Sequence, residues 1–102
     1  MELYQLKGFV AVAELGHMTR AAERLHVSQP ALSAQIRALE SQLSLKLFER
    51  VSGGMRLTAA GRQLLSDAEV VLDAADQLRN RARALCGEPV SYTHLRAHET
   101  VL

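Results

Sequence analysis

Apolar residues recur at helical spacing in three stretches of the first 43 residues, which predicts three short amphipathic helices. The first helix is expected over residues 2–14, and Gly16 is a typical helix stop. Its apolar face consists of Leu3, Leu6, Phe9, Val10 and Ala13. A single amphipathic helix indicates no specific function, so we assign this face to the protein core.

The second helix is expected over residues 19–26, with Thr19 as its N-cap. Its inner side consists of Ala21, Ala22 and Leu25, and such small side chains let another helix approach closely. Only Val27 and Ser28 separate it from the next helix, so the two must cross sharply. This is typical of a helix-turn-helix, whose second helix reads the DNA major groove, although a helical hairpin in any small bundle has the same pattern.

The third helix, which continues to Leu43, has two sides of different chemistry. Its inner side carries Leu32, Ile36, Leu39 and Leu43. Ser28 is placed to cap its first turn, and Pro30 lies where a missing backbone N–H costs nothing. Its outer side carries Pro30, Ala34, Arg37 and Ser41, with Gln29 and Ser33 on the shoulder. Such side chains suit base edges in a major groove, and the alternative is an ordinary solvated helix face.

A β-hairpin is expected between residues 45 and 58. Polarity alternates over residues 45–50, the sequence Ser52-Gly53-Gly54 is a turn signal, and residues 55–58 supply the second strand. Arg50 and Arg56 lie on either side of the glycines. Glycines let a backbone approach phosphates and arginines supply positive charge, so we interpret the hairpin as a DNA-contacting wing. A simple solvated hairpin is the alternative.

The last predicted helix runs from residue 59 to about residue 85, and Thr58 caps it. Its apolar residues form a heptad seam of Leu64, Ala68, Val71, Ala75, Leu78, Ala82 and Leu85. At about 1.5 Å per residue such a helix is longer than a small domain covers, and a heptad seam favours a partner helix. We therefore predict self-association through the seam, and packing on the chain's own domain is the alternative.

Composition changes this picture only slightly. The 102 residues allow one domain, or a small domain with an appended helix. The net charge is +1, but residues 1–66 hold eight basic and five acidic side chains, a balance of +3 that favours a polyanionic partner. Cys86 is the only cysteine, which excludes an intramolecular disulfide. Without an apolar run of about 20 residues or a signal peptide, a cytoplasmic protein without a membrane partner is expected.

Four motifs together resemble the N-terminal winged helix-turn-helix and linker helix of LysR-type transcriptional regulators. The motifs are LKGFVAVA (Leu6–Ala13), TRAAERLHVSQPALSAQIRAL (Thr19–Leu39), LFER (Leu47–Arg50) and LTAAG (Leu57–Gly61). The resemblance covers residues 1 to about 85 and implies a mainly α fold. In that fold, a winged helix-turn-helix (residues 1–58, helix-turn-helix about 18–37) with three helices and a two-stranded wing precedes a linker and dimerisation helix (59–88).

The resemblance also implies a function. Such regulators are bacterial and cytoplasmic, bind double-stranded operator DNA as dimers and often form tetramers; a small-molecule effector binds a C-terminal domain that this chain lacks. The family's groove contacts fall on Gln29, Pro30 and Ser33, and its wing and backbone contacts match Arg50, Ser52 and Arg56. With Thr19, Ser28 and Arg37 these residues form the predicted DNA-binding set. Two positions depart from the family pattern: many relatives have arginine at Ala34 and a basic residue near Gly53-Gly54.

The end of the chain has a different expected origin. Residues 90–100 (VSYTHLRAHET) look like the in-frame translation of a transposase adapter used in sequencing libraries. We therefore expect residues 89–102 to be non-native. His94 and His98 have the spacing of two metal ligands on one helical face, but no third or fourth ligand is near them in the sequence, so we predict no metal site.

Two functions remain to be compared. In the first, the chain is a sequence-specific DNA-binding domain with its third helix in the major groove and its wing on the backbone or in the minor groove. In the second, it only dimerises with a full-length relative and does not bind DNA productively. An enzyme and a cofactor are not expected, because the sequence has no Ser/His/Asp set, no phosphate-binding glycine loop and no metal cluster.

Overall fold

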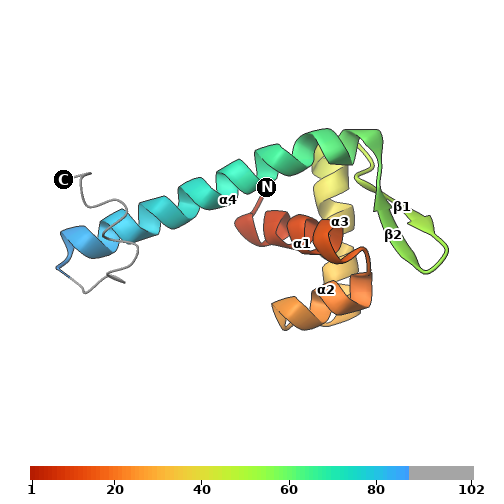
Figure 1. Cartoon of the computed structure of the whole chain (residues 1–102), viewed down its shortest axis with the longest axis horizontal. Helices are drawn as coiled ribbons and strands as arrows, with labels where there is room; N and C mark the ends of the chain where they lie inside the picture. Colours follow the sequence, from red (N-terminus) through yellow and green to blue (C-terminus); the bar gives the residue numbers. More distant parts are fainter. Residues whose placement is uncertain (88–102) are drawn as a thin grey trace. The chain divides into compact units, whose positions relative to one another are not determined.

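The computed structural model describes residues 1–87 of the protein. The predicted non-native tail, with His94 and His98, lies outside these described residues. The elements follow in the order α1 (Leu3–Leu15), α2 (Met18–Leu25), α3 (Gln29–Leu43), β1 (Phe48–Val51), β2 (Gly54–Leu57) and α4 (Ala59–Leu85) (Figure 1). This architecture confirms the predicted mainly α fold with a two-stranded wing.

Two units are distinguished by their internal contacts, with the boundary inside α4. The first unit is Met1–Leu72, and the second begins at Asp73. The first half of α4 therefore belongs to the same unit as α1–α3 and the wing. The predicted division into domains at residue 58 stays a prediction. Among residues 1–87, no helix is long and apolar enough to cross a membrane.

The first hydrogen bonds of α1 and α2 show where these helices begin. The Gln5 side chain accepts a hydrogen bond from the Glu2 N–H at 2.8 Å, and α1 begins at Leu3 rather than at residue 2. The predicted Thr19 cap of α2 is wrong. The His17 carbonyl already accepts the Ala21 N–H at 3.0 Å, so the helical hydrogen bonds begin with His17 as the N-cap.

The predicted cap of α3 is confirmed, because the Ser28 hydroxyl accepts the Ala31 N–H at 3.2 Å.

The residues that follow α1, α2 and α3 all have a left-handed backbone conformation. Gly16, His26 and Ser44 follow α1, α2 and α3 with left-handed φ values of 65°, 60° and 58°. The predicted stop at Gly16 is thus confirmed, and glycine is the residue that adopts this conformation without a steric cost.

The core of the first unit lies between α1, α2 and α3. The predicted inner side of α3 is confirmed, with Leu32, Ile36 and Leu39 buried and Leu43 packed against the core. The buried face of α1 is wider than predicted: Ala11 and Val12 are buried, whereas the predicted Val10 and Ala13 are only half-buried. The reason is that α1 packs against α2, α3 and β2 together, so one apolar stripe does not describe it.

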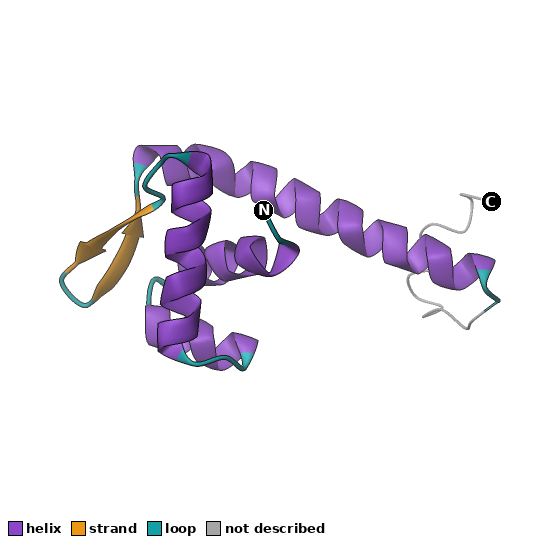
Figure 2. Ribbon diagram, turned by 180° about the vertical axis from the view of Figure 1, so that it is seen from behind, coloured by secondary structure: helices purple, strands orange, loops and turns teal. Residues whose placement is uncertain are grey.

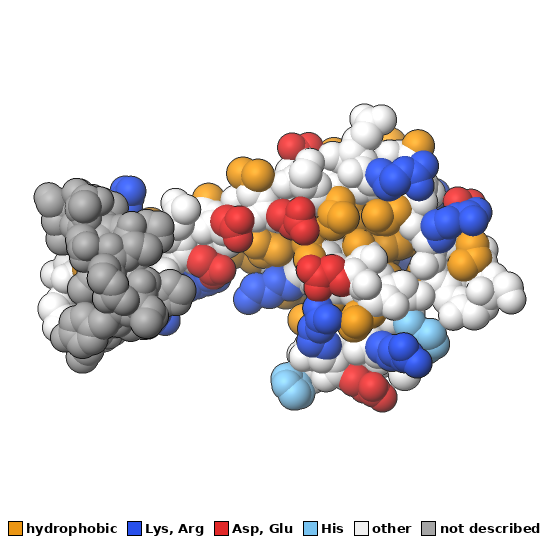
Figure 3. All heavy atoms as spheres, viewed as in Figure 1, with side chains coloured by type: hydrophobic (Ala, Val, Ile, Leu, Met, Phe, Trp, Pro, Cys, Tyr) orange, Lys and Arg blue, Asp and Glu red, His pale blue; other side chains and the backbone are white. Residues whose placement is uncertain are grey.

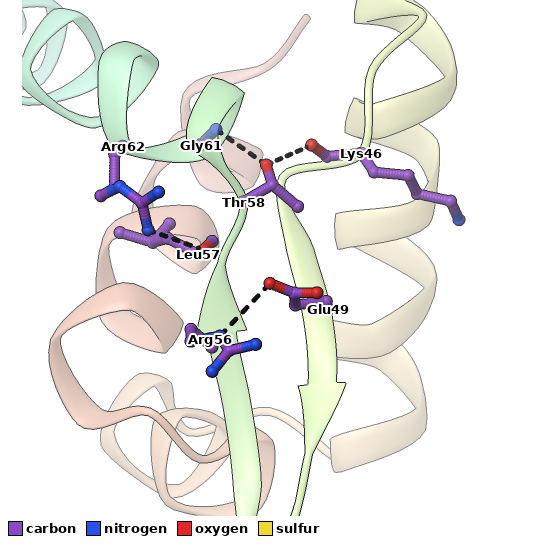
Figure 4. Close-up of polar contacts among 7 residues, drawn as sticks. All are labelled: Lys46, Glu49, Arg56, Leu57, Thr58, Gly61 and Arg62. Atoms are coloured by element: carbon purple, nitrogen blue, oxygen red, sulfur yellow. Dashed lines mark hydrogen bonds and ion pairs between the residues drawn. The ribbon is translucent and has the colours of Figure 1, made fainter.

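The wing is an antiparallel hairpin with Phe48 opposite Leu57 and Val51 opposite Gly54. Its first strand begins at Phe48 rather than at residue 45, and its second strand ends at Leu57. Thr58 is instead used as the cap of α4, where its hydroxyl accepts the Gly61 N–H at 3.0 Å and donates to the Lys46 carbonyl at 2.6 Å (Figure 4). The predicted role of Thr58 is confirmed.

Candidate nucleic-acid interface

The outer side of α3 is the part of the helix that the core leaves uncovered. Figure 2 shows α3 in front of α1, and in both ribbon views the wing lies to one side of α3. Gln29, Pro30, Ala34 and Arg37 are exposed, and Ser33 is half-buried. The side chains predicted to read bases therefore share one accessible surface, which we call the α3 outer side (Gln29, Pro30, Ser33, Ala34, Arg37 and Ser41).

Within this surface, one hydrogen bond orients the most informative side chain. The Gln29 amide nitrogen donates to the Ser33 hydroxyl at 2.9 Å across one helical turn. The amide keeps its carbonyl oxygen and its second N–H for an external partner. A glutamine with one donor and one acceptor free side by side matches the N6 and N7 positions of adenine in a major groove.

The other predicted helix-turn-helix residues are accessible too. Thr19 is exposed in the first turn of α2, and Ser28 is exposed at the start of α3. The Ser28 oxygen already accepts the Ala31 N–H, but its own O–H is free to donate. These hydroxyls suit phosphate oxygens, which position a protein on a duplex without reading its sequence.

The wing supplies cations at its surface. Arg50 and Ser52 are exposed, and the side chain of Arg56 is 63% exposed. Its Nε lies 3.2 Å from a carboxylate oxygen of Glu49, which is opposite Arg56 in the hairpin (Figure 4). An ion pair this exposed contributes little to stability, about 0–1 kcal/mol. A phosphate could therefore exchange with Glu49 as the partner of Arg56.

The α3 outer side differs in charge from the surfaces of α1 and α2. The face of α1 and α2 turned toward the viewer in Figure 3 mixes basic and acidic side chains. Arg24 of α2 and Glu14 of α1 form an ion pair at 2.5 Å. By contrast, the six residues of the α3 outer side include Arg37 and no acid. The α3 outer side therefore combines hydrogen-bonding groups with a positive charge that no acid of the same surface offsets.

At the other end of α3 there is an open hollow of about 460 Å³, lined by Arg37, Glu40, Ser44, Leu45 and Lys46. Its shape does not enclose a ligand. Within residues 1–87, no group of three or more His, Cys, Asp or Glu side chains is placed to hold a metal ion.

Residues 3–62 match the family described as bacterial regulatory helix-turn-helix protein, lysR family. The chain belongs to this family. Its members are regulators rather than enzymes.

TcbR of Pseudomonas sp. (strain P51), an HTH-type transcriptional regulator, is 51% identical over 84 residues, which are 82% of this chain and 29% of TcbR. HcaR of Escherichia coli (strain K12), the hca operon transcriptional activator, is 48% identical over 88 residues, or 86% and 30%. The chain thus spans about three tenths of these relatives.

Solved structures of LysR-family domains resemble this one closely. The crystal structure of a CbnR_DBD–DNA complex has 50% sequence identity and a TM-score of 0.79, and the match covers 84% of this chain and 99% of that one. The complex of BenM_DBD with benA site 1 DNA has 37% identity and a TM-score of 0.79, with 84% and 97% covered. The family and the winged helix-turn-helix predicted from the sequence are confirmed.

The two ends of the predicted heptad seam have different surroundings in this LysR-family chain. Ala68 is buried, and Leu64 packs against the core of the chain's own first unit. Val71, Leu78 and Leu85 are 41%, 69% and 85% exposed, Ala82 is exposed and Ala75 is half-buried. The start of the seam therefore belongs to the core, and dimerisation through the residues from Val71 onward stays a prediction.

Glu40 is a structural residue that the sequence analysis does not predict. This residue follows Ile36 by four positions and precedes Leu43 by three, which places a carboxylate on the apolar side of α3. The residue is only 8% exposed, and one of its oxygens accepts the N–H groups of Leu47 and Phe48 at 2.8 and 3.3 Å. An acid at an inner helical position was the signal that could have identified it.

Proposed function

We propose that this chain is the sequence-specific DNA-binding part of a LysR-type transcription regulator. In this proposal the α3 outer side enters the major groove of operator DNA, and the wing contacts the backbone or the minor groove. The observation that carries the proposal is the exposed Gln29–Ser33 pair on α3, whose remaining donor and acceptor face outward beside an accessible arginine. The likeness to DNA-binding domains solved with DNA supports the same docking.

The roles divide by chemistry. Gln29 and Ser33 offer neutral hydrogen-bonding groups, which discriminate between base pairs. Arg37, Arg50 and Arg56 offer positive charge, which attracts every duplex and makes binding dependent on salt. Thr19, Ser28 and Ser52 offer hydroxyls for phosphate oxygens. Pro30 has no N–H to satisfy, so it leaves the first turn of α3 free to approach the groove closely.

The proposal extends to assembly and location. Two copies joined through the exposed part of the heptad seam would present two α3 helices to one operator, which should then contain an interrupted palindrome. Because bacterial operators lie in the cytoplasm, the regulator is expected to work there. A small-molecule effector, where there is one, would act through the part of such regulators that lies beyond this chain.

The experiment is a selection of bound duplexes from a randomised DNA pool, with the full chain at near-physiological salt. Enrichment of an interrupted palindrome is the expected result, and its half-site spacing would report the geometry of the dimer. Tight but unselective retention would contradict base reading by α3. A chain that retains no DNA and yet associates with a full-length relative would instead support the dimerisation-only function.

A further inference from the structure

The first residue of β1, Phe48, is buried in the core, where its ring meets that of Phe9 in α1 edge to face at 5.6 Å between centroids. Beyond this apolar packing, two separate polar contacts of the main chain hold the wing against the helix-turn-helix. At the base of the wing, the buried Glu40 carboxylate on α3 accepts the N–H groups of Leu47 and Phe48, and Phe48 is the first residue of β1. The same carboxylate has its other oxygen 3.8 Å from the Lys46 ammonium. A side chain of α3 therefore fixes the point at which the wing begins.

The second contact is made near the tip. The Met55 N–H donates to the Gly16 carbonyl at 3.0 Å, and Gly16 lies in the turn between α1 and α2. The neighbouring Gly54 touches the same carbonyl so closely that an added Cβ would lie well inside 3.0 Å of its oxygen. The backbone of the wing thus rests directly on the turn that leads into the helix-turn-helix.

Both contacts matter because the hairpin is too small to place itself. Each strand has four residues, and a two-stranded hairpin alone is at most marginally stable in water. The base of the wing is bonded to α3 and its tip to the turn before α2, and these contacts act with the packing of Phe48 to set the position of the wing relative to both helices. Arg50 and Arg56 are then held at a fixed offset from the α3 outer side.

We propose that Glu40 and the Gly16–Gly54 contact are positioning elements for DNA binding, which align the wing arginines with α3 so that both engage one duplex together. This inference rests on the proposed function. A wing that is already aligned makes its phosphate contacts as soon as α3 is in the groove, with little further loss of freedom. A displaced wing loses those contacts but leaves the base-reading side chains of α3 unchanged.

Gly54→Ala tests the contact at the tip. The backbone of Gly54 is not in the left-handed region, so alanine is disfavoured there only by the collision with the Gly16 carbonyl. Gly53→Asn is the matched control. Gly53 has a φ of 82° and nothing within 4 Å of an added Cβ, and asparagine tolerates that conformation. The control therefore changes the same turn without moving the wing.

Glu40→Ala and Glu40→Gln test the contact at the base. Alanine leaves the Leu47 and Phe48 N–H groups without their acceptor. Glutamine keeps a carbonyl oxygen that can accept both of them. Rescue by glutamine would show that the acceptor, rather than the negative charge, places the wing. Far-ultraviolet circular dichroism of each variant of the whole 102-residue chain identifies a temperature at which all of the variants are folded.

The first measurement needs no DNA. Amide hydrogen exchange should show the Met55 N–H protected in the unmodified chain and in Gly53→Asn, and unprotected in Gly54→Ala. The Leu47 and Phe48 amides should lose protection in Glu40→Ala and regain it in Glu40→Gln. Unchanged protection of Met55 in Gly54→Ala would overturn the assignment of the tip contact.

The second measurement is binding to the selected duplex and to a scrambled one over a range of salt concentrations. In Gly54→Ala and Glu40→Ala, affinity for both duplexes should fall about equally and the salt slope should flatten by about one to two units, as expected for one or two lost phosphate contacts. A full salt slope in both variants would overturn the inference while the proposed function stood. If the unmodified chain bound neither duplex, the proposed function would fail and this role with it.

Discussion

At the residue scale, the Glu49–Arg56 ion pair is expected to reduce the electrostatic attraction between the wing and DNA. They face each other across the hairpin, and both side chains are at least half exposed. The carboxylate neutralises the arginine and would also repel any phosphate that approaches it. The affinity for DNA of any sequence is therefore expected to be lower than it would be if the charge of Arg56 were not offset by Glu49.

Replacing Glu49 by glutamine should remove the negative charge that neutralises Arg56. We expect Glu49→Gln to tighten binding to every duplex, whatever its sequence, and to steepen the salt slope by up to about one unit. Fluorescence anisotropy at several salt concentrations measures both effects. Glu69→Gln makes the same change of charge at an exposed position of α4, and it should alter the DNA affinity and the salt slope less than Glu49→Gln does. Equal effects of the two substitutions would show that only net charge matters.

Gln29 should affect base preference rather than overall attraction. Gln29→Ala removes the oriented amide and should cost about 1–3 kcal/mol against one base pair of the selected duplex. The salt slope should stay the same, because no cation is lost. Competition between the selected duplex and its single-base variants measures the preference. Equal losses on selected and scrambled DNA would contradict the role of Gln29.

At the element scale, α3, the wing and α4 meet at the backbone of Leu47. Its N–H donates to Glu40 of α3, and its carbonyl accepts the Thr58 N–H at 2.9 Å, immediately before α4. Gly61, in the first turn of α4, lies against the same carbonyl with no room for a Cβ. The three elements are thus joined through main-chain groups, which leave little freedom to adjust.

Gly61→Ala should therefore lower the stability of the first unit. Alanine is the better helix former by about 1 kcal/mol, but here its methyl group meets a backbone carbonyl, and such overpacking costs about 1–3 kcal/mol. We expect a net loss, measured by urea denaturation followed by circular dichroism. Gln63→Ala, at an exposed position of the same helix, should be close to neutral. A gain in stability for Gly61→Ala would contradict the close packing.

The sequence was a good guide to the elements whose signals are local. The helical spacing, the Ser28 and Thr58 caps and the Gly16 stop each depend on neighbouring residues, and the structure confirms them. The predicted start of β1 is three residues too early, and at its actual start Phe48 is hydrogen-bonded to the Glu40 carboxylate, eight residues away in α3. The Thr19 cap was wrong because His17 starts the helix without a side-chain hydrogen bond, so no capping residue marked it.

At the scale of the whole molecule, the heptad seam marks the limit of prediction from sequence. Leu64 and Ala68 belong to the same heptad seam as Leu78 and Leu85, yet the first two pack on the chain's own core and the last two are exposed. A periodic pattern states that a face is apolar but not what covers it. The part from Val71 onward, where the seam residues are exposed except for the half-buried Ala75, is the part available to a second copy.

Self-association should therefore depend on Leu78. We expect Leu78→Lys to shift the chain toward the monomer and to weaken binding to a palindromic duplex more than to a single half-site. Sedimentation equilibrium measures the first effect, and titration of both duplexes measures the second. Gln77→Lys adds the same charge one position away, outside the seam, and should leave the association unchanged. Association of Leu78→Lys at the unmodified strength would contradict dimerisation through this seam.

The division of α3 into an inner and an outer side has a practical consequence. Leu32, Ile36 and Leu39 hold the helix in the core, while Gln29 and Arg37 are exposed and Ser33 is half-buried. The residues that keep the protein folded are therefore not those that face a partner. A library randomised at these three outer positions would yield mostly folded members, so the chain is a ready scaffold for engineering new operator preferences.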